Sequence, residues 1–191
     1  MPSGPSLDEL CRRLKASDRE AFAEIFRCFR ADLLRFATSI VEDAWVAHDL
    51  VQDVFVALWN LRATLDPSLP LRPYLFKMTR NRAYRYLRDE RTHARKHAEL
   101  SSAARDHPPD DAMTEHEHDG ALLHRKLTAW IDALPARQRE ALLLARYHAL
   151  SHQEIATVMG ISPRTVNNHI VRALEHLQRC VEAFEPTLLE R

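Results

Sequence analysis

The sequence predicts an all-α protein made of two small helical domains joined by a flexible linker. Only three glycines occur in 191 residues, and the ten prolines fall mostly between periodic segments. So few glycines favour helices over a turn-rich β fold, and they exclude glycine-rich phosphate loops and dinucleotide fingerprints. The apolar share of 46% is ample for packed cores. We place the domains at residues 1–92 and 121–191, with the linker at 93–120.

Three helices are expected in the first third of the chain. A short helix covers residues 7–16, and Asp18 can cap a second one, which carries an aromatic core-facing stripe to about residue 40. The third covers residues 44–61 and buries an apolar face that includes Val51 and Val54. These three helices are read as the core of the first domain.

The third helix also has a polar face. Asp49, Gln52 and Asp53 lie together on it at spacings of three and four residues. Periodicity leaves two interpretations open. The face is either simply solvated, or it is a recognition patch for a basic surface on a partner.

A proline-containing loop at 62–72 leads into a long basic helix at 73–92. The stretch 77–97 holds eight Lys or Arg residues against two acids, and Tyr74, Phe76 and Tyr84 are interleaved with them. Guanidinium groups can hold phosphates and rings can stack on unpaired bases, so this pattern favours nucleic-acid binding over a merely solvated helix. The net charge is zero, but the charges are segregated along the chain.

The linker, residues 93–120, is acidic and rich in histidine. The spacing of His116, His118 and His124 fits no standard zinc site, so no metal or cofactor is predicted. Three widely separated cysteines indicate reduced, buried thiols. No signal peptide or membrane-spanning stretch is evident, so we expect a cytoplasmic protein without membrane insertion.

The second domain begins with helices at 121–134 and 136–147 and ends in a helix-turn-helix at 151–178. Ser151 and Glu154 form a capping box, and Gly160 stands where the first helix must stop. Ser162 caps the second helix, with Pro163 at its first position. The buried stripe of that helix is expected to contain Val166, Ile170, Ala173, Leu174, Leu177 and Val181. The last residues, 186–191, are expected to be loose.

The opposite face of that helix carries groups that read DNA bases. It is expected to present Arg164, Asn167, Asn168, Val171, Arg172, Glu175 and Gln178. Arginine can pair with guanine, asparagine with adenine, and an aliphatic side chain can contact a thymine methyl. A helix-turn-helix places such a face in the major groove, whereas two ordinary packed helices would leave it merely solvated.

Three segments resemble one known family in order and spacing. Residues 133–177 resemble region 4 of bacterial RNA polymerase sigma factors of the extracytoplasmic-function (ECF) type. Residues 43–61 resemble their region 2.2, and residues 71–91 their regions 2.3 and 2.4. The resemblance implies a protein that binds RNA polymerase core and directs promoter-specific transcription initiation.

The resemblance also implies roles for individual residues. Region 2.2 docks on the β′ coiled coil, and the matching residues are Asp49, Gln52 and Asp53. The −10 element is read with one base flipped, and the matching residues are Leu61, Leu65, Lys77, Met78 and Asn81. Region 4 reads the −35 element, and the matching residues are Asn167, Asn168, Val171 and Arg172, with Arg164 and Thr165 near the backbone. The β flap and an anti-sigma factor are the further partners implied.

Some residues depart from the family pattern. Tyr74 stands where the family often has Trp, Pro73 beside it is unusual, and Arg164 replaces a frequent Gly. The promoter sequence therefore does not follow from the resemblance.

Three other classes of function would require different sequence features. A conventional DNA-binding regulator acting without polymerase would carry a sensory or dimerisation domain before the helix-turn-helix. An enzyme would need a set such as Ser/His/Asp or HExxH, and the sequence has neither. An adaptor or anti-sigma-like protein would lack the base-reading residues.

Overall fold

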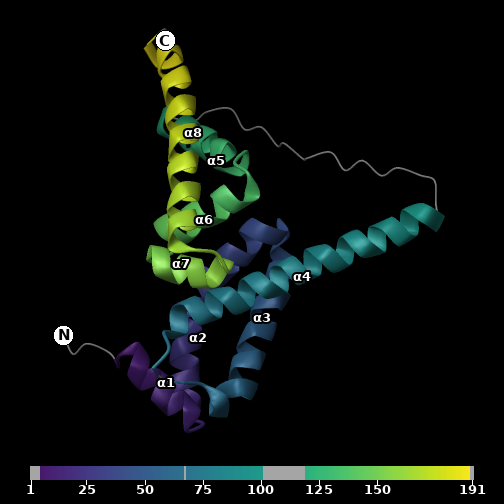
Figure 1. Ribbon diagram of the computed structural model, residues 1–191, viewed down its shortest axis with the longest axis vertical. Coiled ribbons are helices and arrows are strands. Elements are labelled where there is room, and N and C mark those ends of the chain that lie inside the picture. The colour runs from purple at the N-terminus through teal and green to yellow at the C-terminus, as the bar shows by residue number, and fades with distance from the viewer. Residues whose placement is uncertain (1–4, 67, 101–118, 190–191) are drawn as a thin grey trace.

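The computed structural model describes residues 5–66, 68–100 and 119–189 (Figure 1). Within these ranges the chain is helical and contains no strand, which confirms the all-α prediction. The elements are α1 (Leu7–Lys15), α2 (Arg19–Val41), α3 (Ala44–Leu61), η1 (Arg62–Thr64), α4 (Leu71–Leu100), α5 (Asp119–Asp132), α6 (Ala136–Arg146), α7 (His152–Met159) and α8 (Pro163–Leu189).

Aspartate side chains fix where α2 and α3 begin. The Asp18 carboxylate accepts hydrogen bonds from the backbone N–H groups of Glu20 and Ala21, at 2.8 and 3.2 Å. Arg13 donates to the same carboxylate at 2.7 Å, and this bond, with the backbone ones, lowers the pKa of Asp18. Asp43 caps α3 in the same way. These carboxylates satisfy N–H groups that have no partner inside the helix.

Helices α1 to α4, here called the N-terminal domain, pack around one core. The side chains with essentially no exposed surface are Leu14, Ala21, Ile25, Leu33, Phe36, Ala37, Ala47, Val54, Leu58, Leu75, Phe76, Thr79 and Ala83. Along α2 and α3 these residues recur at helical spacing, as one buried face of each helix requires. The predicted apolar face of α3 is confirmed, since Val51 and Val54 are both buried.

Helices α5 to α8, here called the C-terminal domain, end in the predicted helix-turn-helix. The hydroxyl of Ser151 accepts from the N–H of Glu154, and the Glu154 carboxylate accepts from the N–H of Ser151, which completes the capping box. Gly160 has a φ of +66°, a conformation that costs glycine little and other residues more. The capping box and the glycine together set the short turn between α7 and α8.

The two domains share a continuous core. Helix α7 packs against α4 and α6 lies near α2, as Figure 1 shows. Buried residues of the C-terminal domain, among them Leu144, Leu150 and Ile155, belong to the same apolar cluster as Phe36 and Phe76 of the N-terminal domain. The sequence predicted two domains but not this contact between them.

Helix α4 is longer at both ends than predicted. It starts at Leu71, so Pro73 lies in its first turn, where a missing N–H breaks no hydrogen bond. It continues to Leu100, past the expected end near residue 92. Residues 62–64, in the predicted loop, form η1. The stretch from 93 to 100, which the sequence analysis assigns to the linker, is therefore helical, because it contains no proline or glycine.

The C-terminal domain also departs from the prediction at its ends. Helix α5 begins at Asp119, inside the predicted linker, and α8 continues through Pro186 to Leu189, where a loose end was expected. Proline that close to a helix end removes a single backbone hydrogen bond. The rest of the predicted linker, residues 101–118, lies outside the described residues.

Several residues that were predicted to be buried are exposed or only half-buried. Cys28 is exposed and Cys180 is half-buried, whereas Cys11 is buried as expected. Leu174 and Val181 of α8 are 38% and 41% exposed. Leu174 follows the buried Ala173 by one residue, which turns its side chain by about 100° away from the buried stripe. Val181 lies in the last third of α8.

Candidate nucleic-acid interface

One face of α8 presents polar side chains to solvent. The exposed residues of this face are Arg164, Asn167, Asn168, Val171, Arg172, Glu175 and Gln178. On the opposite side Val166 and Ile170 are buried, and their packing against the rest of the domain fixes the rotation of the helix. The predicted division of α8 into a buried and an exposed face is confirmed at these positions.

The remaining residue of the expected reading set is Thr165, which is half-buried. Its backbone N–H donates to the Ser162 hydroxyl at 3.1 Å, and the two hydroxyl oxygens are 2.8 Å apart. Ser162 therefore caps α8 as predicted. Because the Thr165 hydroxyl is part of this cap, the side chain serves the start of the helix and lies beside backbone N–H groups that favour an anion.

The exposed face of α8 has the chemistry of direct readout. A major groove about 12 Å wide admits an α-helix, and arginine and asparagine side chains form paired hydrogen bonds with guanine and adenine there. Asn167, Asn168 and Val171 lie within the first three turns of α8. This is the part of a second helix that a helix-turn-helix presents to base edges.

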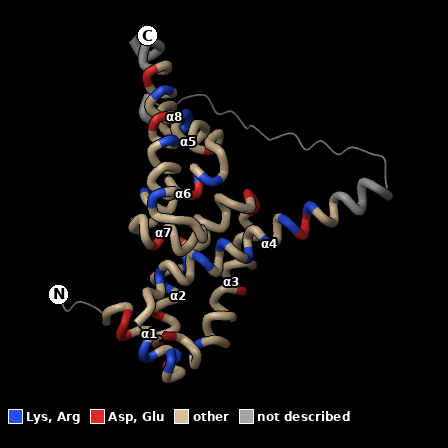
Figure 2. The backbone as a smooth tube through the Cα atoms, viewed as in Figure 1, with Lys and Arg blue, Asp and Glu red and all other residues tan. Residues whose placement is uncertain are grey.

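The basic face of α4 is a second candidate surface. Lys77, Asn81, Arg85 and Arg88 are exposed at spacings of three and four residues, so they share one side of the helix. Figure 2 shows the Lys and Arg positions following one another along α4. Such a row can hold several phosphates of one strand.

The other residues expected to read the −10 element lie at the two ends of the η1 loop and on α4. Leu61 is 43% exposed at the end of α3. Leu65 and Met78 are half-buried. These apolar side chains are partly available, as the wall of a pocket for an unstacked base requires.

The aromatic residues of α4 do not form the predicted stacking surface. Phe76 has no exposed surface and lies between other rings, 5.3 Å from Phe36 and 4.8 Å from His148 between centroids. The Tyr84 hydroxyl donates to the Glu140 carboxylate at 3.1 Å, and burial, together with that carboxylate, raises its pKa. Tyr74 is half-buried in the core. The helical period places Phe76 on the inward side of α4. Its basic neighbours in the sequence therefore do not indicate where its ring points.

The acidic face of α3 is exposed. Asp49, Gln52 and Asp53 all face solvent, and neither carboxylate has an ion-pair partner among the described residues. The Gln52 amide nitrogen lies 3.0 Å from Nδ1 of His48. Two unpaired carboxylates beside an amide can accept several hydrogen bonds from a basic partner.

Two apolar residues extend this face, and the sequence interpretation missed them. Trp45 is 86% exposed and Val56 is 58% exposed. Both share the side of α3 that carries Asp49 and Gln52, because positions 45, 49, 52 and 56 follow the helical repeat. The spacing of Trp45 and Val56 relative to Asp49 and Gln52 was the sequence signal that could have placed them on this face.

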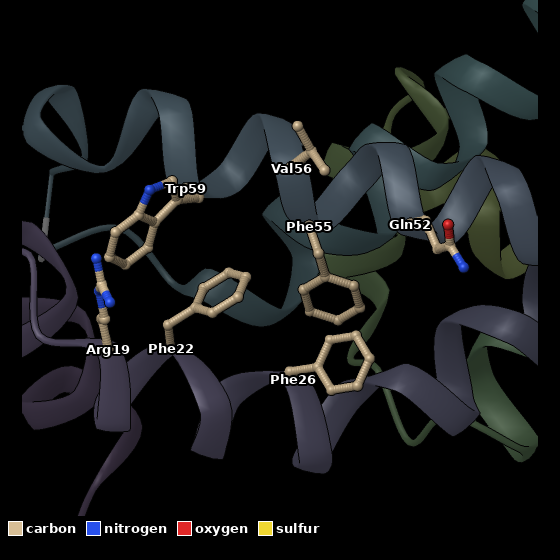
Figure 3. A pocket seen from close by; sticks show the side chains of 7 residues that line it. All are labelled: Arg19, Phe22, Phe26, Gln52, Phe55, Val56 and Trp59. Atoms are coloured by element: carbon tan, nitrogen blue, oxygen red, sulfur yellow. The ribbon is translucent and has the colours of Figure 1, made fainter.

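A mostly apolar hollow of about 660 Å³ adjoins the acidic face, between α2 and α3. It is lined by Arg19, Phe22, Phe26, Gln52, Phe55, Val56 and Trp59, as Figure 3 shows. Phe22 meets Phe55 and Trp59 edge to face, with centroids 6.3 and 5.3 Å apart. The hollow therefore has rigid aromatic walls and a polar edge at Gln52.

Neither a metal site nor a membrane span is found in the described part of the chain. No group of three or more His, Cys, Asp or Glu residues there is arranged to hold a metal ion. His124 lies on α5, and His116 and His118 lie outside the described residues. None of the described helices combines the length and the low polarity that crossing a bilayer demands.

Two family models match this chain. The model described as Sigma-70 region 2 matches residues 25–93, and the model described as Sigma-70, region 4 matches residues 124–177. Together they cover more than half of the chain, and they fall on the helices that carry the acidic face, the basic face and the helix-turn-helix.

Similar proteins include two sigma factors. The chain is 27% identical over 179 residues to the ECF RNA polymerase sigma factor SigK of Mycolicibacterium vanbaalenii, covering 92% of this chain and 89% of the relative. It is 28% identical over 189 residues to the RNA polymerase sigma factor NccH of Alcaligenes xylosoxydans xylosoxydans, covering 95% and 98%.

Solved structures share the fold. CnrH, in complex with the cytosolic domain of CnrY, superposes with a TM-score of 0.66 at 23% identity, covering 93% of this chain and 99% of that one. The sigma factor RpoE from Bartonella quintana, in complex with the anti-sigma factor NepR, gives 0.63 at 22% identity, covering 84% and 96%. The chain thus belongs to the sigma-70 family and is an RNA polymerase sigma factor of the ECF type, a protein that directs transcription initiation.

Proposed function

We propose that this sigma factor divides its work between the two ends of the chain. A domain at residues 1–92 binds core polymerase and the −10 element, a linker at 93–120 follows, and a domain at 121–191 reads the −35 element. The observation that carries this proposal is that an acidic face, a basic face and a base-reading face are all exposed on one chain. A conventional regulator has no use for the acidic face of α3.

Asp49, Gln52 and Asp53 are proposed to dock on the β′ coiled coil of core polymerase. Their exposure supports this role, and so does the fact that neither carboxylate forms an ion pair with another described residue, because a basic partner can then contact both. Trp45 and Val56 would add apolar contact at the rim of the same surface. The C-terminal domain is proposed to contact the β flap.

Promoter reading is proposed to use two sets of side chains. Leu61, Leu65, Lys77, Met78 and Asn81 would capture and hold the opened −10 strand. Arg164, Thr165, Asn167, Asn168, Val171 and Arg172 would contact the −35 element. The strand must be opened at a few kcal/mol per base, and the phosphate contacts of exposed Arg85 and Arg88 would offset part of this.

The proposal includes no catalytic step and places the protein in the cytoplasm with the polymerase. An anti-sigma factor is a further proposed partner. CnrH and the Bartonella quintana RpoE were each solved with a second protein, and the latter is named an anti-sigma factor. The apolar hollow beside Gln52 offers such a partner a place to bury a side chain.

The test is transcription by purified core polymerase on a library of random promoters, with and without this protein. We expect promoter-specific initiation that depends on the protein and is lost with Asp53→Lys, since a lysine would repel a basic coiled coil. Glu182→Lys is the matched control, because Glu182 is also an exposed acid and lies on α8. If operator binding occurred without any core-dependent initiation, the polymerase-docking role would be refuted.

A further inference from the structure

The two domains are joined at α4 by a buried ion pair. The Arg80 guanidinium donates to the Glu140 carboxylate, and a second nitrogen of the same guanidinium lies 3.4 Å from the other carboxylate oxygen. The Arg80 side chain is 12% exposed and that of Glu140 is 2% exposed. Tyr84 also donates to Glu140, and Arg80 stacks over the Tyr84 ring at 4.7 Å. Glu140 of α6 therefore binds two residues of α4 at once.

A second contact lies beside this ion pair. Arg139, next to Glu140 on α6, donates to the backbone oxygen of Ser39 at 3.2 Å and to the Glu42 carboxylate at 3.1 Å. Ser39 and Glu42 lie at the C-terminal end of α2. Neighbouring residues of one helix thus bind two helices of the N-terminal domain, which defines the orientation of the C-terminal domain.

The α4 residues held by Glu140 belong to the helix proposed to bind the −10 strand. Arg80 lies one residue before Asn81 and three after Lys77. In the structure its guanidinium, a strong phosphate ligand, is covered by a carboxylate. A phosphate and a carboxylate offer the same paired oxygens to arginine. The geometry therefore makes Glu140 and a DNA phosphate alternatives at Arg80.

The closed arrangement also sets how far apart the two reading surfaces can be. Helix α7 packs on α4. A path from α4 to Arg172 crosses from α4 to α7, follows α7, passes through the turn and continues along α8. Its length is at most about 50 Å. Two promoter elements centred about 25 base pairs apart are separated by about 85 Å along straight DNA. The closed form cannot reach both elements of a straight promoter together.

We propose that Glu140 is an internal phosphate mimic that latches the C-terminal domain onto α4 and keeps the free protein in a closed, DNA-incompetent form. The inference rests on the proposed −10 role of α4. A buried ion pair gains little net free energy over its solvated ions, so the latch specifies the closed geometry without making it irreversible. Promoter DNA and core polymerase can then open it by replacing Glu140 at Arg80.

The closed form can be measured in the free protein. Nitroxide labels on Cys28 of α2 and Cys180 of α8 place one probe on each domain, whereas Cys11 is buried. We expect one narrow distance distribution for the wild type. In Glu140→Arg, which sets two guanidiniums against each other, we expect a broader distribution at longer distance. Glu140→Gln, which keeps the shape of the side chain, should shift the distribution in the same direction and serves if the arginine variant fails to fold.

The matched control is Glu182→Arg, which reverses an exposed acid on the same domain away from α4 and should keep the wild-type distribution. Reversing both partners, Arg80→Glu with Glu140→Arg, should restore the closed distance. The proposal would be overturned by a wild-type distribution already as broad as that of Glu140→Arg, or by identical distributions in the two proteins.

DNA binding gives an independent readout. The probe is a fluorescein-labelled single-stranded oligonucleotide of mixed sequence, titrated at several salt concentrations. One freed phosphate contact should steepen the slope of log affinity against log salt by about 0.7 in Glu140→Gln. Adding Arg80→Ala should remove that gain. An unchanged slope would refute the competition between Glu140 and phosphate.

The label distances involve neither polymerase nor promoter. If the domains stay closed in the free protein but no core-dependent transcription occurs, the proposed function fails and the latch stands. If transcription occurs but the distances do not respond to Glu140, the latch fails and the proposed function stands.

Discussion

His148 gives this protein a stability that depends on pH. The residue lies between α6 and α7 and inserts its ring into the N-terminal domain, where it is 3% exposed. It is 4.8 Å from the Phe76 ring and 5.9 Å from the Phe36 ring, between centroids. Its Nδ1 has no hydrogen-bond partner among the described residues, and the nearest Asp32 oxygen is 3.9 Å away. A proton on Nδ1 would therefore lie near the Asp32 carboxylate without forming a hydrogen bond to it.

Burial lowers the pKa of His148 from 6.5 to about 4. The Asp32 carboxylate acts in the opposite direction, and the guanidiniums of Arg35 and Arg72 add to the lowering. Between these two pKa values the unfolded chain binds more protons than the folded one. The free energy of unfolding therefore falls as the pH falls below 6.5, and this contribution is complete by about pH 4.

The size of the effect follows from the two pKa values. A single group with these values loses about 2 kcal/mol of folded-state stability between about pH 7.5 and about pH 5, and about 3 kcal/mol at still lower pH. Because the ring is buried at the domain interface, part of this loss should appear as opening of the interface before global unfolding.

The assay is urea unfolding at about pH 7.5 and about pH 5, for the wild type and for His148→Phe. Carboxylates also titrate over this range, so the informative quantity is the difference between the two proteins. His148→Phe keeps an aromatic ring without the proton, and we expect it to lose about 2 kcal/mol less than the wild type on acidification. His152→Gln, which changes an exposed histidine of α7, should behave as the wild type.

Equal losses of stability in the wild type and in His148→Phe would refute this reasoning. They would mean that the interface holds a charged imidazole as easily as a neutral one, so that the burial of His148 has no electrostatic consequence.

Two further predictions concern the helix-turn-helix. Gly160→Ala should lower the free energy of unfolding by about 1 kcal/mol through backbone strain alone, since an added Cβ at φ +66° meets nothing within 4 Å. Urea unfolding measures it, and Gly160→Asn, which tolerates this conformation better, should cost less; equal costs would contradict the strain argument. Asn168→Ala should weaken binding of a selected −35 sequence by about 1–3 kcal/mol while leaving mixed-sequence DNA unaffected. Competition binding measures it against Glu182→Ala, an exposed control further along α8 and outside the reading face, and an equal loss on all sequences would exclude base reading.

Local signals in the sequence were sufficient for most helices and their caps. The predicted caps Asp18, Ser151 and Ser162 each accept a backbone hydrogen bond at a helix start. Such caps depend on residues within one turn, so neighbouring letters of the sequence are enough to predict them. The predicted bounds of α3 agree with the structure at both ends.

The predictions that failed depended on residues far away in the chain. The basic residues that follow Phe76 in the sequence favour a ring that stacks on bases, but the ring is buried against Phe36 and His148. Arg80 is one of the eight basic residues of the stretch 77–97, yet Glu140, sixty residues later in the chain, binds it. Cys28 was assigned to the core from its residue type alone, and it is exposed.

Helical period and capping are local properties, so the sequence alone predicted most of the helices, the helix-turn-helix and the polar faces of α3 and α8. Its resemblance to a known family also indicated the function. Only the tertiary structure decided that the two domains close on one another, that Glu140 covers Arg80, and that His148 is buried between rings of the other domain. Desolvation and ion pairing depend on which residues lie on the other side of an interface. A local sequence pattern does not specify those residues, because they are distant in the chain.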